Sequence, residues 1–146
     1  MQAKGIRILD KKNGLVSVEL PSIFSEIKNG DSLYWSILYS YATGDLGQGQ
    51  SIPEYEQKIA DFEKGSFISW GELNLLSKKL YDVMDFTLIG CYDQTFLKRY
   101  ENECEMHDSC DIVIEMIDSS YWEVYSKNEK LIEKLAAKFK QVEFLD

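Results

Sequence analysis

Residues 111–126 read DIVIEMIDSSYWEVYS, and the alternation within this stretch decides the fold. Apolar and polar residues alternate on both sides of a short polar centre, which is typical of two β-strands. Asp and Ser favour turns, because their short side chains hydrogen-bond to the local backbone. Residues 118–120 are therefore predicted to be the turn of a hairpin. The alternative, a catalytic serine in this turn, lacks a neighbouring histidine to activate it.

The same patterns predict the elements around this hairpin. Helix starts are indicated by Pro53 in a first turn and by the capping-box pattern from Ser69 to Glu72. Strands are predicted over 5–9 and 15–20 (joined as a hairpin at Asn13-Gly14), 31–44, 86–93, 111–118, 121–126 and 141–145. Helices are predicted over 53–64, 70–84, 94–103 and 127–140, with a short helical turn or a loop over 22–30 and a connection over 104–110. In the strand over 31–44, one face is predicted to carry Leu33, Trp35, Ile37, Tyr39 and Tyr41.

These elements predict the fold class. We expect an α+β protein, a single domain over residues 1–146, with a mainly antiparallel sheet and three or four helices packed on it.

The composition restricts the partners that the chain can have. Its net charge of −9 repels nucleic-acid phosphates and anionic membrane surfaces, and it favours association with a basic partner. Solubility alone is the alternative explanation for this charge. No apolar run is long enough to cross a bilayer, and the first residues contain no apolar signal segment. Three cysteines without framework spacing indicate reduced thiols, so we expect a cytoplasmic protein that binds neither nucleic acid nor membrane directly.

One group has the residue types of a metal site: Cys91, Cys104, His107 and Cys110. Three thiolates and an imidazole satisfy tetrahedral zinc. However, the group has no CxxC pair, and isolated cysteines are commonly small buried apolar residues. We therefore expect no metal and no cofactor. A metal- or thiol-dependent regulatory protein that uses these four residues is the alternative function.

Catalysis has little support in the sequence. The GxSxG, HExxH, GxGxxG and P-loop motifs are absent. His107 is the only histidine, so acid–base chemistry would need this residue or a tuned carboxylate. Glu115 and Glu123 on the two hairpin strands are such a carboxylate pair, but their alternation with apolar residues predicts that they face solvent. We expect that the protein is not an enzyme.

The stretch over 101–111 carries five acidic residues and no Lys or Arg. It is either a solvated loop or a negative patch that covers a cationic site on another protein, with nearby aromatic residues as anchors. The candidate partner-binding residues are Glu101, Glu103, Glu105, Asp108, Asp111 and Tyr121.

Four segments resemble small bacterial immunity proteins, the antidotes of polymorphic toxins such as those of contact-dependent growth inhibition systems. These segments are YWSILYSYATGDLGQG (34–49), ISWGELNLLSKKL (68–80), LIGCYDQTFLKRYE (88–101) and CDIVIEMIDSSYWEVYSKNEKLIEKLAAKF (110–139). The resemblance implies a non-enzymatic protein that binds one cognate toxin domain, often a nuclease, and blocks its active site or substrate surface. Together with the charge, it leads us to expect a basic, nuclease-type toxin as the partner.

Overall fold

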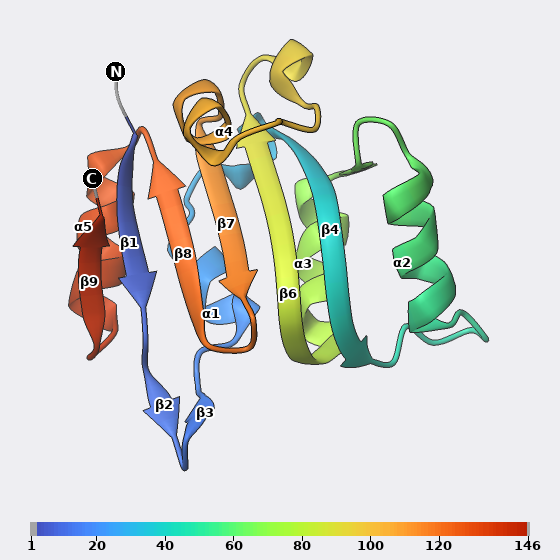
Figure 1. Cartoon of the computed structure of the whole chain (residues 1–146), viewed down its shortest axis with the longest axis horizontal. Helices are drawn as coiled ribbons and strands as arrows, with labels where there is room; N and C mark the ends of the chain where they lie inside the picture. The colour runs from blue at the N-terminus through green and yellow to red at the C-terminus, as the bar shows by residue number, and fades with distance from the viewer. Residues whose placement is uncertain (1–2, 146) are drawn as a thin grey trace.

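The computed structural model describes residues 3–145, and it confirms the predicted α+β class. Seven antiparallel strands form one sheet in the order β5-β4-β6-β7-β8-β1-β9 (Figure 1). The strands are β1 (Lys4–Ile8), β4 (Tyr34–Gly44), β5 (Ser66–Ile68), β6 (Leu80–Cys91), β7 (Ile112–Ile117), β8 (Tyr121–Ser126) and β9 (Val142–Leu145), and a separate small sheet pairs β2 (Lys11–Lys12) with β3 (Leu15–Val16). The α-helices are α1 (Leu20–Phe24), α2 (Ile52–Asp61), α3 (Trp70–Lys79), α4 (Glu103–Ser109) and α5 (Glu129–Lys138).

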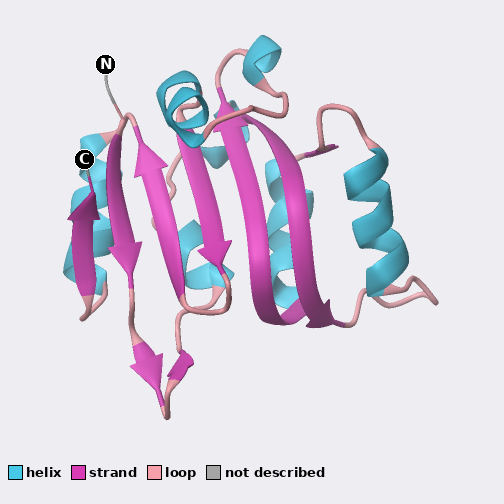
Figure 2. Cartoon of the chain, viewed as in Figure 1, coloured by secondary structure: helices cyan, strands magenta, loops and turns pink. Residues whose placement is uncertain are grey.

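The two faces of the sheet differ in how they are covered. Helices α1, α3 and α5 lie behind the sheet, α4 lies in front, near one end of the strands, and α2 lies beside the β4 edge (Figures 1 and 2). We call the first side the covered face and the second the open face. A cross-strand row on the covered face is fully buried, with 0% exposure at each residue: Ile37, Leu88, Ile114, Val124 and Ile6. The main core therefore lies between the sheet and these three helices.

The hairpin that decided the fold is confirmed. Strands β7 and β8 pair from Ile112–Ser126 to Ile117–Tyr121. In the turn, Asp118 and Ser119 have φ angles of 48° and 56°, a left-handed backbone that suits a tight hairpin. The backbone N–H of Ser119 donates to the carbonyl of Met84 at 2.8 Å, so the turn is also tied to β6.

Both predicted helix starts are confirmed, but one helix end is wrong. The Ser69 hydroxyl accepts from the Glu72 N–H at 3.2 Å, which is the N-cap bond of a capping box. The Glu72 carboxylate accepts from the Ser69 hydroxyl at 3.0 Å rather than from the Ser69 backbone N–H. Helix α3 then ends at Lys79 rather than at residue 84. Residues from Leu80 onward join β6 instead, because they pair with the end of β4. Tertiary pairing overrides the helical spacing of the apolar residues there.

The helix predicted over 94–103 is also wrong. Only a 3₁₀ turn, Gln94–Phe96, forms there, and the following segment is irregular. The Arg99 guanidinium in this segment donates to the carbonyls of Leu38, Ile59 and Phe62, and these bonds hold the chain against β4 and α2. The connection predicted over 104–110 is instead helical, since it lies almost entirely within α4.

The N-terminal hairpin is only partly as predicted. Asn13 and Gly14 form the expected turn, with φ angles of 56° and 79°, but it joins only β2 and β3. Strand β1 lies between β8 and β9 and pairs with both. The strand predicted over 15–20 is therefore shorter, and α1 begins at Leu20.

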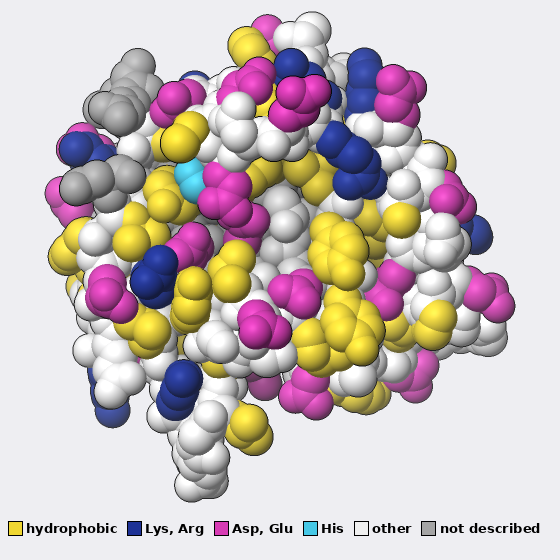
Figure 3. All heavy atoms as spheres, in the orientation of Figure 1, with side chains coloured by type: hydrophobic (Ala, Val, Ile, Leu, Met, Phe, Trp, Pro, Cys, Tyr) yellow, Lys and Arg dark blue, Asp and Glu magenta, His cyan; other side chains and the backbone are white. Residues whose placement is uncertain are grey.

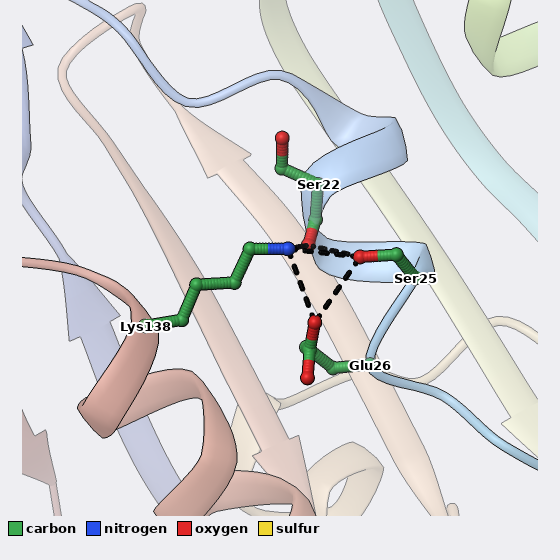
Figure 4. A network of polar contacts seen from close by, with 4 residues as sticks. All are labelled: Ser22, Ser25, Glu26 and Lys138. Atoms are coloured by element: carbon green, nitrogen blue, oxygen red, sulfur yellow. Dashed lines mark hydrogen bonds and ion pairs between the residues drawn. The ribbon is translucent and has the colours of Figure 1, made fainter.

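A polar clamp joins two helices of the covered face (Figure 4). The Lys138 ammonium at the end of α5 donates to the Ser22 carbonyl at 2.7 Å, the Ser25 hydroxyl at 2.8 Å and the Glu26 carboxylate at 3.1 Å. This contact holds the pKa of Glu26 below its ordinary value, chiefly through the hydrogen bond from Lys138. None of the helices within residues 3–145 is long and apolar enough to cross a membrane.

Candidate functional site: the open face of the sheet

A polar row crosses the open face over six strands. Directly paired residues of neighbouring strands share a face, and here the pairing brings together Tyr39, Thr87, Glu115, Glu123, Arg7 and Glu143. The adjacent row on the covered face is entirely apolar up to β1. The open face is thus the polar side of a two-sided sheet.

Arg7 and Glu123 form a pair within this row. Both Nε and Nη2 of Arg7 contact the Glu123 carboxylate, at 2.9 and 2.7 Å. The guanidinium carbon also lies 4.4 Å from the ring centroid of Tyr121, a cation–π contact. The hydrogen bond to Glu123 raises the pKa of Arg7. Glu123 is therefore a buried carboxylate with a cation beside it.

Glu115 lies directly beside Glu123 but is not satisfied in the same way. It is 6% exposed. Its only hydrogen-bond partner in the described part of the chain is the Thr87 hydroxyl, at a long 3.4 Å, and its Oε1 lies 3.6 Å from the His107 Nε2 without a hydrogen bond. The prediction that Glu115 and Glu123 face solvent is wrong, because α4 and the long side chains around them cover this part of the face.

A glycine positions the histidine over Glu115. Gly5 of β1 pairs with Tyr125 of β8, and a Cβ at Gly5 would lie 2.5 Å from the Tyr125 ring. Without that Cβ, the ring lies over β1. The imidazole of His107 stacks on the ring with centroids 3.6 Å apart and planes at 14°. Helix α4 is anchored here because its Met106 is buried in a small second core.

The predicted partner-binding residues fall into three places. Glu101, Glu103, Glu105 and Asp108 are exposed in or beside α4. Asp111, at the start of β7, accepts a hydrogen bond from the Tyr92 N–H at 2.8 Å, so its carboxylate serves partly within the fold. Tyr121 lies at the opposite end of the strands, under Arg7. Four of the six candidates thus form one acidic patch, which we call the α4 patch.

The candidate metal ligands are separated. Cys91 and Cys110 are buried together in the second core, Cys104 is exposed, and His107 faces Glu115. The contact with Cys110 and burial raise the pKa of the Cys91 thiol, so this sulfur stays protonated. Within residues 3–145, no three His, Cys, Asp or Glu side chains gather where they could hold a metal ion.

Two exposed tyrosines of the open face were misplaced by the sequence prediction. Tyr39 and Tyr41 are 51% and 53% exposed. The prediction put them on the same face as Trp35 and Ile37, but the register of β4 shifts between Ile37 and Tyr39, a β-bulge. The bulge turns Trp35 and Ile37 toward the helices and both tyrosines toward the open face. Because strict alternation carries no sign of an inserted residue, the pattern alone could not reveal this.

Figure 3 shows the open face as a whole. The histidine lies between hydrophobic and acidic side chains, further hydrophobic side chains gather over the β4 side, and the surface is hollowed between the two groups. No protein-family model matches the chain, and neither a curated protein nor a solved structure is similar to it at a significant level.

Proposed function

We propose that this chain is a cytoplasmic immunity protein, a non-enzymatic inhibitor that binds a basic, nuclease-type toxin domain through its open face. The observation that carries the proposal is the contrast between the two faces of the sheet. One face is closed by helices, and the other presents acidic residues and exposed tyrosines, with α4 packed on it only near one end of the strands. A face of this kind is typical of a surface that is completed by a partner.

The negative charge of this chain supports a positively charged partner. The α4 patch contains four exposed carboxylates, and the one ion pair found for them in residues 3–145 is a 3.9 Å contact between Lys98 and Glu105, which solvent screens. Together with the net charge of −9, the patch attracts a basic protein and speeds its association. The same field repels nucleic acid, so this chain would compete with the substrate of a nuclease for the toxin rather than bind that substrate.

The proposal is tested by co-purification with the polypeptide encoded beside this chain, and by the survival of cells that produce that polypeptide. We expect a stable complex and protection from toxicity. A chain that neither binds nor protects would refute the proposal.

The role of the α4 patch is tested separately. Charge reversal of Glu103 and Glu105 to Lys should lower the association rate about tenfold or more at low salt. An affinity that does not change with salt would remove the α4 patch from the mechanism.

A further inference from the structure

A notch on the open face has the chemistry of an arginine site. Its floor is Thr87, a short side chain between two long ones, Tyr39 on β4 and Glu115 on β7. Asp85 lies on the same face two residues earlier in β6. Figure 3 shows a hollow on the open face, with hydrophobic side chains on one side and acidic side chains on the other. We call these four residues the Thr87 notch.

The carboxylates of the notch lack a cation. Within residues 3–145, neither Asp85 nor Glu115 forms an ion pair with Lys or Arg, and the contact of Glu115 with His107 is an ion pair only when the imidazole is protonated. Glu115 is more than nine-tenths buried. Its Oε1 faces the His107 Nε2 at 3.6 Å, and its Oε2, on the side of the notch, has only the long 3.4 Å hydrogen bond from the Thr87 hydroxyl. A buried carboxylate in this condition costs free energy, which a donor from a partner would recover.

The neighbouring pair shows what a suitable donor looks like. Glu123, the next residue in the same row, receives two N–H groups from Arg7, whose guanidinium lies over the Tyr121 ring. In the Thr87 notch, a carboxylate and a tyrosine are present in the same row, but no arginine is. A guanidinium suits both groups, because it donates in a planar fork and stacks on aromatic rings, whereas an ammonium is a compact point charge.

We propose that the Thr87 notch receives an arginine side chain of the basic partner, with its guanidinium donating to Glu115 and Asp85 and packing against Tyr39. This inference rests on the proposed function and deepens it, because it names the anchor within the open face. The α4 patch then steers the partner, and the notch holds it. Association rate and complex lifetime are accordingly controlled by different residues.

The test compares variants for affinity to the polypeptide encoded beside this chain. Thr87→Leu fills the notch and keeps the charge, and Glu115→Gln removes the charge and keeps the size. Each should weaken binding about tenfold or more, mainly through faster dissociation. Thr87→Ser and Glu133→Gln are the matched controls, because the first keeps a small hydroxyl and the second removes an exposed carboxylate on α5. Both should stay within about twofold of the wild-type affinity. Urea unfolding of each variant checks that it is folded.

The two proposals fail in different ways. If the wild type binds and both notch variants bind equally well, the notch is refuted and the immunity function stands. If the wild type does not bind, the immunity function is refuted, and the notch is decided by NMR titration with argininamide and lysinamide. Argininamide should shift the amide signals of 85–89 and 113–117 in the wild type and not in Thr87→Leu. Absence of these shifts, or equal shifts with lysinamide, would refute an arginine site.

Discussion

The two faces of the sheet differ in polarity and burial, although they are built from the same strands. On the covered face, every member of the central row from Ile37 to Ile6 is fully buried and apolar. On the open face, the row one residue along contains three carboxylates, an arginine, a threonine and a tyrosine. In β6, Leu88 and Thr87 are adjacent in sequence and belong to different rows. The comparison separates residues that hold the fold together from residues that are available for function.

The same contrast appears within the open face, between Glu123 and Glu115. Both are buried, but Glu123 has Arg7 at 2.7 Å and Glu115 has a long hydrogen bond to a hydroxyl. The stability of the fold favours the arrangement of Glu123, because a buried carboxylate is tolerated when a cation is paired with it. Departures from this rule tend to occur at functional sites. Glu115 is therefore the residue of the row on which the proposal of a partner's arginine rests.

The largest expected change in stability comes from substitutions on the two faces of a single strand, β6. Leu88→Ala removes a fully buried side chain from the main core and should lower the free energy of unfolding by about 2–5 kcal/mol. Thr87→Ala, one residue earlier on the open face, should cost less than about 1 kcal/mol, because Thr87 is partly exposed and its hydroxyl contributes only a long hydrogen bond. Urea unfolding followed by circular dichroism measures both. Equal losses would mean that the open face is as important to stability as the covered face.

Breaking the satisfied pair should have the next largest effect. Arg7→Met keeps the aliphatic stem and leaves the Glu123 carboxylate buried without its cation. We expect a loss of about 1–3 kcal/mol, below the range for fully buried pairs because the Arg7 side chain is 31% exposed. The double variant Arg7→Met/Glu123→Gln should recover much of this loss, since it removes the unpaired charge. Lys4→Met, an exposed position on the same strand, is the control and should change stability little.

The sequence predicted the elements that depend on contacts between residues close in the chain, and it failed where an element depends on contacts with a distant segment. Local signals were sufficient for the hairpin at Asp118, for the helix starts at Pro53 and Ser69, and for α5, because turn chemistry, capping and periodicity act within a few residues. The end of α3 and the segment around Arg99 were mispredicted because both depend on contacts with β4, which is distant in sequence.

The open face was harder to predict than the fold. Its charge and the exposed residues of α4 followed from composition, but its geometry depends on single features that a pattern does not reveal. The bulge before Tyr39 exchanges the faces of β4, and the missing Cβ of Gly5 makes room for Tyr125. The position of His107 over Glu115 follows from the lack of a Cβ at Gly5, because His107 stacks on the Tyr125 ring that lies there. Alternation predicted two exposed carboxylates, whereas the sheet buries both and pairs only one with a cation.

Substitution of Glu115, the buried carboxylate without a cation, is expected to stabilise the protein. Glu115→Gln replaces an unpaired buried carboxylate with a neutral side chain of the same size, whose amide can donate to the His107 Nε2. We expect the free energy of unfolding to rise by about 1 kcal/mol, whereas Glu123→Gln, which breaks the pair with Arg7, should lower it. Thermal and urea unfolding at neutral pH measure both changes. If Glu115→Gln is as destabilising as Glu123→Gln, the two carboxylates are equally well satisfied and the argument for a partner at Glu115 fails.

The smallest effect concerns the polar clamp at the outer edge of the covered face, where Lys138 holds Glu26 (Figure 4). Because the pKa of Glu26 is lower in the folded chain than its ordinary value, this carboxylate stabilises the fold at neutral pH, and the contribution is lost as the pH falls through the folded-state pKa. The side chains of Lys138 and Glu26 are 34% and 25% exposed, so solvent screens the pair and Glu26→Gln should cost only about 0.5 kcal/mol at pH 7. The difference from wild type should shrink as the medium is acidified. Glu133→Gln, at an exposed position of α5, is the control, and we expect it to change the free energy of unfolding little. If the cost of Glu26→Gln persists in acid, the clamp acts through packing rather than charge.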